Sequence, residues 1–248
     1  GVPLTLDHLS SDDEIGVLEM GMSEPGQITI LGEIIHPNIG VVTNVGVSHI
    51  EMMGTRDNIC REKLDIQNGL PEDGTLLLNG DNDMIRKHLS YVKKPYEFYG
   101  FAPDCTYRAE NIQVQGSQTF FRFCYKETAE DILLNVLGDH NVSNALAAIA
   151  IGLKYQVPME AIKTQLSTFS GQRQTIIHSH GYTIIDDSYN ASPDSMKASL
   201  KILSNYKSGG RKIAVLSDML ELGEKAPEYH REVGRFLAST DVTDLYVT

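Results

Sequence analysis

Short apolar runs alternate with helical segments along the first hundred residues of this 248-residue chain, and this alternation constrains its fold most. The pattern predicts strands at residues 15–20, 39–44 and 75–82. It predicts helices between them, over residues 23–37 and 55–70. Strands separated by helices of this length are typical of a parallel sheet built from βαβ units. The sequence therefore predicts an α/β fold.

The helix predicted over residues 23–37 carries signals at both of its ends. Ser23 is a candidate N-cap, Pro25 suits the first turn, and Pro37 ends the helix. Its apolar face consists of Ile28, Leu31, Ile34 and Ile35.

The chain changes character at residues 105–138, which are β-rich with a Gly-Ser turn, so we predict a small antiparallel patch there. We place the domain boundary in the following linker, FSGQRQ. Residues 1–170 then form a domain with a mostly parallel sheet, and residues 171–248 form a partial Rossmann-like domain. The elements predicted after the patch are helices at 140–156 and 158–169, a hairpin at 175–188, a helix from 192, a strand at 212–218, a helix around 229–237 and a strand at 244–248.

The charge balance argues against nucleic-acid partners and anionic membrane surfaces. The chain has 21 Lys and Arg against 33 Asp and Glu, a formal net charge of -12. Its three cysteines form no CxxC pair, which suits a reducing cytosol. No apolar run approaches the roughly 18 residues of a membrane span, and no signal-peptide pattern begins the chain. We expect a soluble cytoplasmic protein.

Polar side chains gather directly after the predicted strands, where open α/β sheets bind their ligands. Glu19 and His49 follow adjacent strands, so their carboxylate and imidazole can share a divalent cation. Each also has an ordinary explanation, as a capping or ion-paired carboxylate and as a loop histidine. Lys63 lies in the next helix, either returning to the same strand ends or solvated. The segment 218–223 follows a later strand.

Two asparagines and one arginine are candidates for a ligand that carries phosphate or carbonyl groups. Asn141 and Asn144, three positions apart, can line the first turn of one helix. Helix capping explains one of them but explains the pair less well. Arg173 in the linker can reach a phosphate, although an isolated linker arginine is usually solvated.

The segment DDSYNASP, residues 186–193, places two acids and an aromatic residue in one turn. A tight turn accounts for Asn190 and Ser192, but it requires neither two carboxylates nor Tyr189. Asp187 is suited to accept a hydrogen bond from a ribose hydroxyl. The turn and the ribose interpretations both stay open on the residues alone.

These motifs, taken in order, resemble the ATP-dependent Mur ligase family over essentially the whole chain. The matching segments are GVPLTL, LEMGMSEPGQI, IGVVTNVGVSHIEMMG, ICREKLDI, GDHNVSNALAAIAI, IIDDSYNASPDSM and SDMLELG. An ordered set is far more specific than any one motif. The segment DSYNASPDS resembles the pattern of the members that add D-alanyl-D-alanine.

The resemblance implies a peptidoglycan-synthesis ligase that uses ATP and Mg²⁺ in cell-wall biogenesis. Such an enzyme phosphorylates the carboxylate of UDP-MurNAc-tripeptide, and the amine of D-alanyl-D-alanine then attacks the acyl phosphate. It implies that residues 1–170 are the central ATP-binding domain, that residues 171–248 are the C-terminal domain, and that the full-length protein is a monomer.

The resemblance also implies a role for each candidate residue. Glu19, His49 and a carbamylated Lys63 would be magnesium ligands, with His49 and Lys63 closest to the chemistry. The residues implied near ATP are Asn141, Asn144, Arg173, Asp187 and Asn190, and those implied near the incoming dipeptide are Tyr189 and Ser192.

The chain also departs from the family pattern. No Gly-Lys-Thr or Gly-Lys-Ser of a P-loop occurs in it. We therefore expect a piece of a longer ligase that lacks the N-terminal domain, the P-loop and the C-terminal end, and that is inactive alone. Ser192, Ser217 and Ser48 replace residues that are usually Asn, Gly and Ala in the family.

Two other functions remain open on the sequence. One is a different amide ligase of the same superfamily, such as a folylpolyglutamate synthase or another Mur enzyme. The other is a non-catalytic nucleotide-binding module. The segment DSYNASPDS argues against the first.

Overall fold

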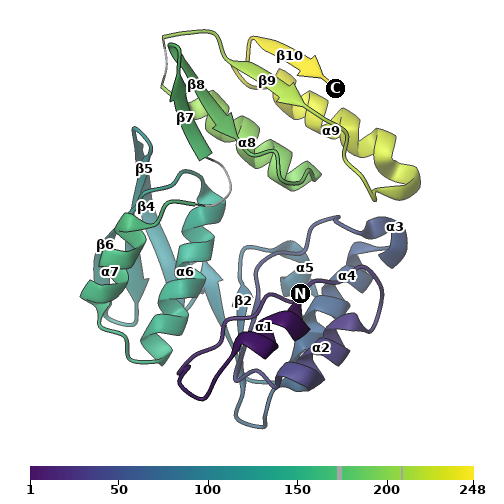
Figure 1. Cartoon of the computed structure of the whole chain (residues 1–248), viewed down its shortest axis with the longest axis vertical. Coiled ribbons are helices and arrows are strands. Elements are labelled where there is room, and N and C mark those ends of the chain that lie inside the picture. The colour runs from purple at the N-terminus through teal and green to yellow at the C-terminus, as the bar shows by residue number, and fades with distance from the viewer. Residues whose placement is uncertain (172–174, 208) are drawn as a thin grey trace.

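The computed structural model describes residues 1–171, 175–207 and 209–248, and these fold into two α/β units (Figure 1). The first unit contains a six-stranded sheet whose spatial order follows the chain. Its strands are β1 (Ile39–Val42), β2 (Thr75–Asn79), β3 (Tyr96–Gly100), β4 (Tyr107–Gln115), β5 (Gln118–Tyr125) and β6 (Thr128–Leu134). The pairs from β1 to β4 are parallel, and β4–β5 and β5–β6 are antiparallel. The predicted mostly parallel sheet with an antiparallel patch is confirmed.

Strand β2 shows why the parallel part of the sheet needs helices on both of its faces. Leu76, Leu77 and Leu78 are all fully buried. Leu77 joins one apolar cluster, whereas Leu76 and Leu78 join another, because successive side chains of a strand point to opposite faces. A run that is apolar at every position is typical of a strand covered on both sides.

Different helices cover the two faces. The Leu77 face packs on α6 (Asp139–Lys154), with α7 (Met159–Thr168) against β6. The other face packs on helices that come before and between the first strands. These are α2 (Gln27–Ile35), α4 (Arg56–Leu64), the 3-10 turn η1 (Asp65–Gly69) and α5 (Asp83–Lys87).

The second unit follows residue 175. It has an antiparallel hairpin, β7 (Thr175–Ser179) and β8 (Tyr182–Asp186), and a parallel pair, β9 (Ile213–Leu216) and β10 (Asp244–Val247). Helices α8 (Pro193–Asn205) and α9 (Ala226–Ala238) pack on each other and bury a third cluster. Every element predicted after residue 175 is present.

Several short elements were not predicted from the sequence. They are α1 (Val2–His8), α3 (Ile50–Met53), η2 (Leu89–Tyr91), η3 (Gly223–Lys225), α5 and β3. Among the described residues, no helix combines the length and the apolar character that spanning a bilayer requires.

The strand predicted at residues 15–20 is wrong. This segment has no regular secondary structure, and Ile15 and Val17 are exposed. A strand exists only where its backbone groups pair with a neighbour. Within the part of the chain that the structure describes, β1 pairs with β2 alone and offers residues 15–20 no ladder.

The predicted start of α2 is also wrong. The helix begins at Gln27 with Gly26 as its N-cap, so Pro25 precedes the helix and Ser23 does not cap it. The acceptor comes instead from α4, because the Glu62 carboxylate accepts hydrogen bonds from the backbone N–H groups of Gly26 (2.7 Å) and Ile28 (2.9 Å). A buried carboxylate distant in sequence therefore replaces a local cap.

Candidate active site

Polar side chains from two other elements hold the loop that follows β1. Asn79 at the end of β2 donates to the Thr43 carbonyl (2.8 Å). Asn82, the N-cap of α5, donates to Asn44 Oδ1 (2.7 Å) and accepts from two N–H groups of its own helix. The polar residues after the first two parallel strands therefore lie together at the carboxyl ends of those strands.

Lys63 reaches the same loop. Its Nζ donates a 2.8 Å hydrogen bond to the carbonyl oxygen of Asn44. Burial lowers the pKa of the Lys63 ammonium, and the nearby Cys60 opposes that shift only weakly. The lysine is thus directed toward the strand ends, and it is half-buried rather than fully exposed. A lowered pKa makes the neutral amine more accessible, which is the form that reacts with electrophiles.

His49 begins the short helix α3 and contacts the second unit. Its backbone is in the left-handed region (φ 62°), which is uncommon for a residue with a side chain. Its Nδ1 pairs with the carboxylate of Glu221, a residue of the loop between β9 and α9. Sequence reasoning singled out the segment 218–223 but assigned no role to Glu221.

Glu19 is exposed, and in the described residues its side chain makes no hydrogen bond or ion pair. Among those residues no three His, Cys, Asp or Glu side chains gather as a metal-binding group. The structure thus brings Lys63 to the loop that contains His49, and it leaves Glu19 outside any such cluster.

The two asparagines of α6 differ in their surroundings. Asn141 is half-buried, and its Nδ2 donates to the Leu137 carbonyl (2.7 Å), whereas Asn144 is exposed. Arg173 lies outside the described residues.

The DDSYNASP segment forms the connection between β8 and α8. Asp187 accepts a hydrogen bond from Ser199 of α8, and Asp186 accepts from the hydroxyl of Ser188 (2.7 Å). Ser192 is the N-cap of α8 and forms a reciprocal capping box with Ser195. Ser192 therefore has a structural function here.

The remaining two candidates of this segment lie at its surface. Asn190 accepts from the N–H of Ala191 (2.8 Å), and Tyr189 is 73% exposed. Both residues are exposed.

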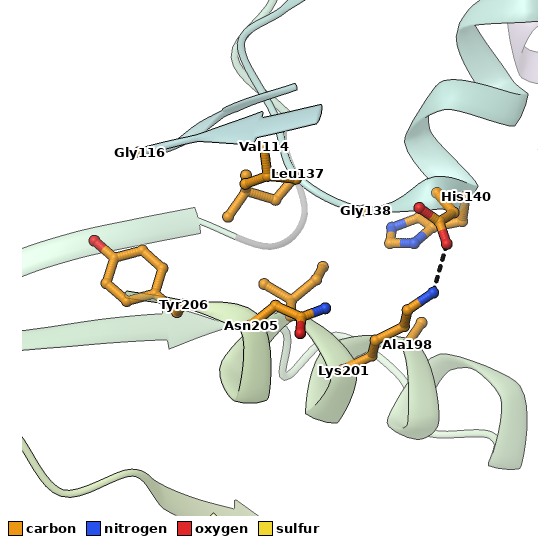
Figure 2. A pocket seen from close by; sticks show the side chains of 11 residues that line it. Val114, Gly116, Leu137, Gly138, His140, Ala198, Lys201, Asn205 and Tyr206 are labelled. Carbon is orange, nitrogen blue, oxygen red and sulfur yellow. Dashed lines mark hydrogen bonds and ion pairs between the residues drawn. The ribbon is translucent and has the colours of Figure 1, made fainter. Parts of the chain in front are cut away.

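A cavity of about 240 Å³ lies between the first turn of α6 and helix α8. Figure 2 shows the imidazole of His140 at this cavity and Tyr206 at its far side, with Leu137 between them. Asp139 and Lys201 close one end through a 2.6 Å ion pair that links the two units. Burial lowers the pKa of His140 against the opposing effects of the Asp187 and Asp139 carboxylates, which favours the neutral form of the imidazole.

Sequence reasoning missed His140, although it immediately precedes Asn141. The feature that could have pointed to His140 is Gly138, the glycine of the turn before α6. A side-chain carbon on that glycine would lie 2.6 Å from the His140 ring. That turn has φ 99°, a conformation that glycine adopts without strain.

Comparisons with known proteins match both units of the chain, in the same order. The Mur ligase middle domain matches residues 1–152, and the Mur ligase, glutamate ligase domain matches residues 172–248. The UDP-N-acetylmuramoyl-tripeptide–D-alanyl-D-alanine ligase of Bacillus subtilis (strain 168) is 36% identical over 99% of this chain and 53% of its own length. The Escherichia coli (strain K12) enzyme of the same name is 31% identical over 94% of this chain and 52% of its own.

Two solved structures have the same fold. A crystal structure of MurF from Acinetobacter baumannii has a TM-score of 0.91 at 28% identity, covering 99% of this chain and 54% of that one. MurF from Thermotoga maritima in complex with ADP has a TM-score of 0.89 at 27% identity, covering 100% and 57%. The chain spans about half the length of the curated relatives it matches. Family models match both of its units in order, and the chain belongs to the Mur ligase family.

Proposed function

We propose that this chain is part of an ATP-dependent ligase that joins D-alanyl-D-alanine to UDP-MurNAc-tripeptide. The observation that carries the proposal is the match of both units, across nearly the whole chain, to ligases named for this reaction. We propose residues 1–170 as the ATP-binding domain and residues 171–248 as the C-terminal domain. The reaction assigns the protein to peptidoglycan precursor synthesis, and we propose a cytoplasmic monomer for the full-length enzyme.

The chemistry explains why such a ligase consumes ATP. A carboxylate is a poor electrophile, so its oxygen first takes the γ-phosphoryl group of ATP and ADP leaves. The dipeptide amine then attacks the carbonyl carbon, the amide bond forms, phosphate leaves and the amine loses a proton. Magnesium would supply positive charge where the anionic nucleotide and carboxylate meet.

The proposed magnesium ligands are Glu19, His49 and Lys63. A carboxylate and an imidazole have suitable donor atoms, but an ammonium group has no lone pair to offer. Lys63 fits only once its amine has reacted with CO₂, and burial favours the neutral amine that this reaction requires. Among the described residues no three His, Cys, Asp or Glu side chains form a metal-binding group, so Glu19 and His49 would need the modified Lys63 to complete the set.

The modification of Lys63 can be tested without measuring activity. Protein equilibrated with ¹³C-bicarbonate should give a carbamate carbon signal that disappears in Lys63→Arg. A spectrum without that signal in the unmodified sequence would remove Lys63 from the ligand set.

For the nucleotide we propose Asn141, Asn144, Arg173, Asp187 and Asn190. The family resemblance supports all five, and Arg173 rests on it alone. For Asp187 the structure adds support, since its carboxylate acts on His140, which lines the cavity at the start of α6. For the dipeptide we propose Tyr189 and Ser192. Ser192 is the weaker of these, because its hydroxyl already caps α8.

The proposed function is tested by assaying the complete gene product with ATP, Mg²⁺, UDP-MurNAc-tripeptide and a panel of amines. We expect amide formation with D-alanyl-D-alanine, detected by mass, and we expect the 248-residue chain alone to be inactive. Preference for glutamate or a diamino acid would instead indicate another amide ligase of the family. ATP binding without turnover on any amine would indicate a non-catalytic module.

A further inference from the structure

The contact between His49 and Glu221 joins two parts of the chain separated by 172 positions. His49 belongs to the loop after β1, and Glu221 belongs to the loop after β9. Both residues have left-handed backbone conformations, with φ 62° and φ 59°. Such conformations are costly for residues other than glycine, and they persist where the surrounding structure holds them.

Three further contacts hold the same two loops together. The backbone N–H of Glu51 donates to the carbonyl of Glu221 (3.2 Å). Gly223 lies beside Glu51, so that a side-chain carbon on the glycine would be in van der Waals contact with the Cα of Glu51, at 3.4 Å. Val47 is 8% exposed and belongs to the apolar cluster of the second unit, with Met219 as one of its partners. The pairing of His49 with Glu221 therefore belongs to a packed contact between loops.

The hydrogen bond determines which ring nitrogen of His49 carries a proton. An ionised carboxylate only accepts hydrogen bonds, so Nδ1 of His49 must donate to Glu221. In a neutral ring the lone pair then resides on Nε2 alone. A carboxylate partner of this kind commonly fixes both the tautomer and the ring orientation of a functional histidine.

We propose that Glu221 is a positioning residue for His49, provided by the C-terminal unit. When the two units dock, Glu221 holds Nδ1 and leaves Nε2 as the nitrogen that faces a ligand. This inference rests on the proposed function only for the role of His49 in the reaction. The tautomer itself is a property of this chain.

The first test is NMR of the histidine ring nitrogens in the 248-residue chain. We expect Nδ1 of His49 to be protonated, and to remain so in Glu221→Gln, whose side-chain oxygen still accepts. In Glu221→Ala the ring should change to the Nε2–H form that isolated imidazoles favour. The control is Glu224→Ala, which removes a carboxylate three positions away that forms no hydrogen bond or ion pair with His49 among the described residues, and it should leave the spectrum unchanged.

The second test uses the complete gene product. We expect Glu221→Ala to lower kcat by about 10- to 100-fold, the usual effect of losing such a partner. The KM for ATP should change by less than about twofold, because the nucleotide contacts remain. Glu221→Gln should recover much of the lost rate, and Glu224→Ala should keep full activity.

The outcomes separate this inference from the proposed function. An Nε2–H tautomer in the unmodified chain, or an unchanged His49 spectrum in Glu221→Ala, would overturn the positioning role whatever the enzyme does. An unmodified gene product with no ligase activity would contradict the proposed function, while the NMR result would still decide the pairing.

Discussion

Glu62 accepts a 2.9 Å hydrogen bond from the backbone N–H of Ile28, although the two residues are 34 positions apart. The same carboxylate accepts from the N–H of Gly26 and is only 5% exposed. The first N–H groups of helix α2 thus donate to a side chain that belongs to α4.

Replacing Glu62 should therefore destabilise the first unit. In Glu62→Ala one buried and one part-buried N–H group lose their acceptor, and we expect a loss of about 2–4 kcal/mol in the free energy of unfolding. Glu62→Gln keeps one acceptor but turns an amide donor toward the other N–H, so an intermediate loss is expected. Urea titration measures the free energy of unfolding of both Glu62 variants. The control is Glu33→Gln, at an exposed position of α2. Equal midpoints for Glu62→Ala and the control would contradict this account.

Two glycines in different helical segments should respond to alanine in opposite directions. A side-chain carbon on Gly69 would lie 2.2 Å from the carbonyl oxygen of Gly32, in backbone that cannot move aside. We expect Gly69→Ala to cost about 3 kcal/mol or more, by the overpacking mechanism. Gly234 in α9 meets nothing within 4 Å, so Gly234→Ala should stabilise by about 0.5–1 kcal/mol through helix propensity. Thermal denaturation of the two variants side by side tests the sign of each effect.

The buried thiols of Cys60 and Cys105 should weaken the fold in alkali. Burial raises the pKa of each thiol to about 11, from an ordinary value of 9.0. The unfolded chain then loses its thiol protons first as pH rises, so stability is complete below pH 9 and declines as pH approaches 11. As the pH rises past 11, the ionisation of each thiol should lower the free energy of unfolding by an amount on the order of 1–3 kcal/mol.

Urea titrations at intervals from pH 8 upward measure this decline. Cys60→Ala should reduce its slope, whereas Cys124→Ala at a half-buried position is the matched comparison. An unchanged slope in Cys60→Ala would show that this thiol ionises as readily in the folded state.

Asn82 should have two separable contributions to stability. Its Oδ1 caps α5 through Met84 and Ile85, and its Nδ2 tethers the β1 loop through Asn44. Asn82→Asp keeps the cap but loses the donor and places a carboxylate against Asn44 Oδ1, while Asn82→Ala loses both functions. We expect the free energy of unfolding to fall by about 1–2 kcal/mol in Asn82→Asp and by about 2–3 kcal/mol in Asn82→Ala.

The loop tether also has a functional readout. In the complete gene product, Asn82→Asp should lower activity more than its stability loss explains, because the loop that leads to His49 is released. Amide hydrogen exchange of residues 43–47 should rise in the same variant. Unchanged exchange there would mean that Lys63 and Asn79 suffice to hold the loop.

Local patterns in the sequence predicted most of the elements, and they failed where a distant partner decides the outcome. The apolar runs of the sequence located β1 and β2, of which β2 is buried on both faces, and helical periodicity located the later helices. The segment 15–20 has the same apolar character but has no ladder to join among the described strands. The cap of α2 was missed because Glu62 reaches it only once α4 has packed.

In the candidate site, too, the sequence predicted what depends on local patterns and missed what depends on distant partners. Order along the chain indicated that polar residues follow the strand ends, but it did not single out Asn82, whose contact with Asn44 appears only in the folded structure. The pairing of His49 with Glu221 depends on how two units dock, and no periodicity or spacing encodes that.

The burial of Val47 in the apolar cluster of the second unit sets an energy scale for separating the two units. Removing one valine from such a cluster costs about 1.5–3 kcal/mol, which corresponds to a bias of about 10- to 100-fold toward the docked arrangement. A bias of that size is comparable to the coupling free energies by which ligands shift conformational equilibria. The contribution of Val47 alone therefore favours the docked arrangement by a free energy of the same size as a typical ligand-induced shift, and the contacts of Glu221 with His49 and Glu51 add to it.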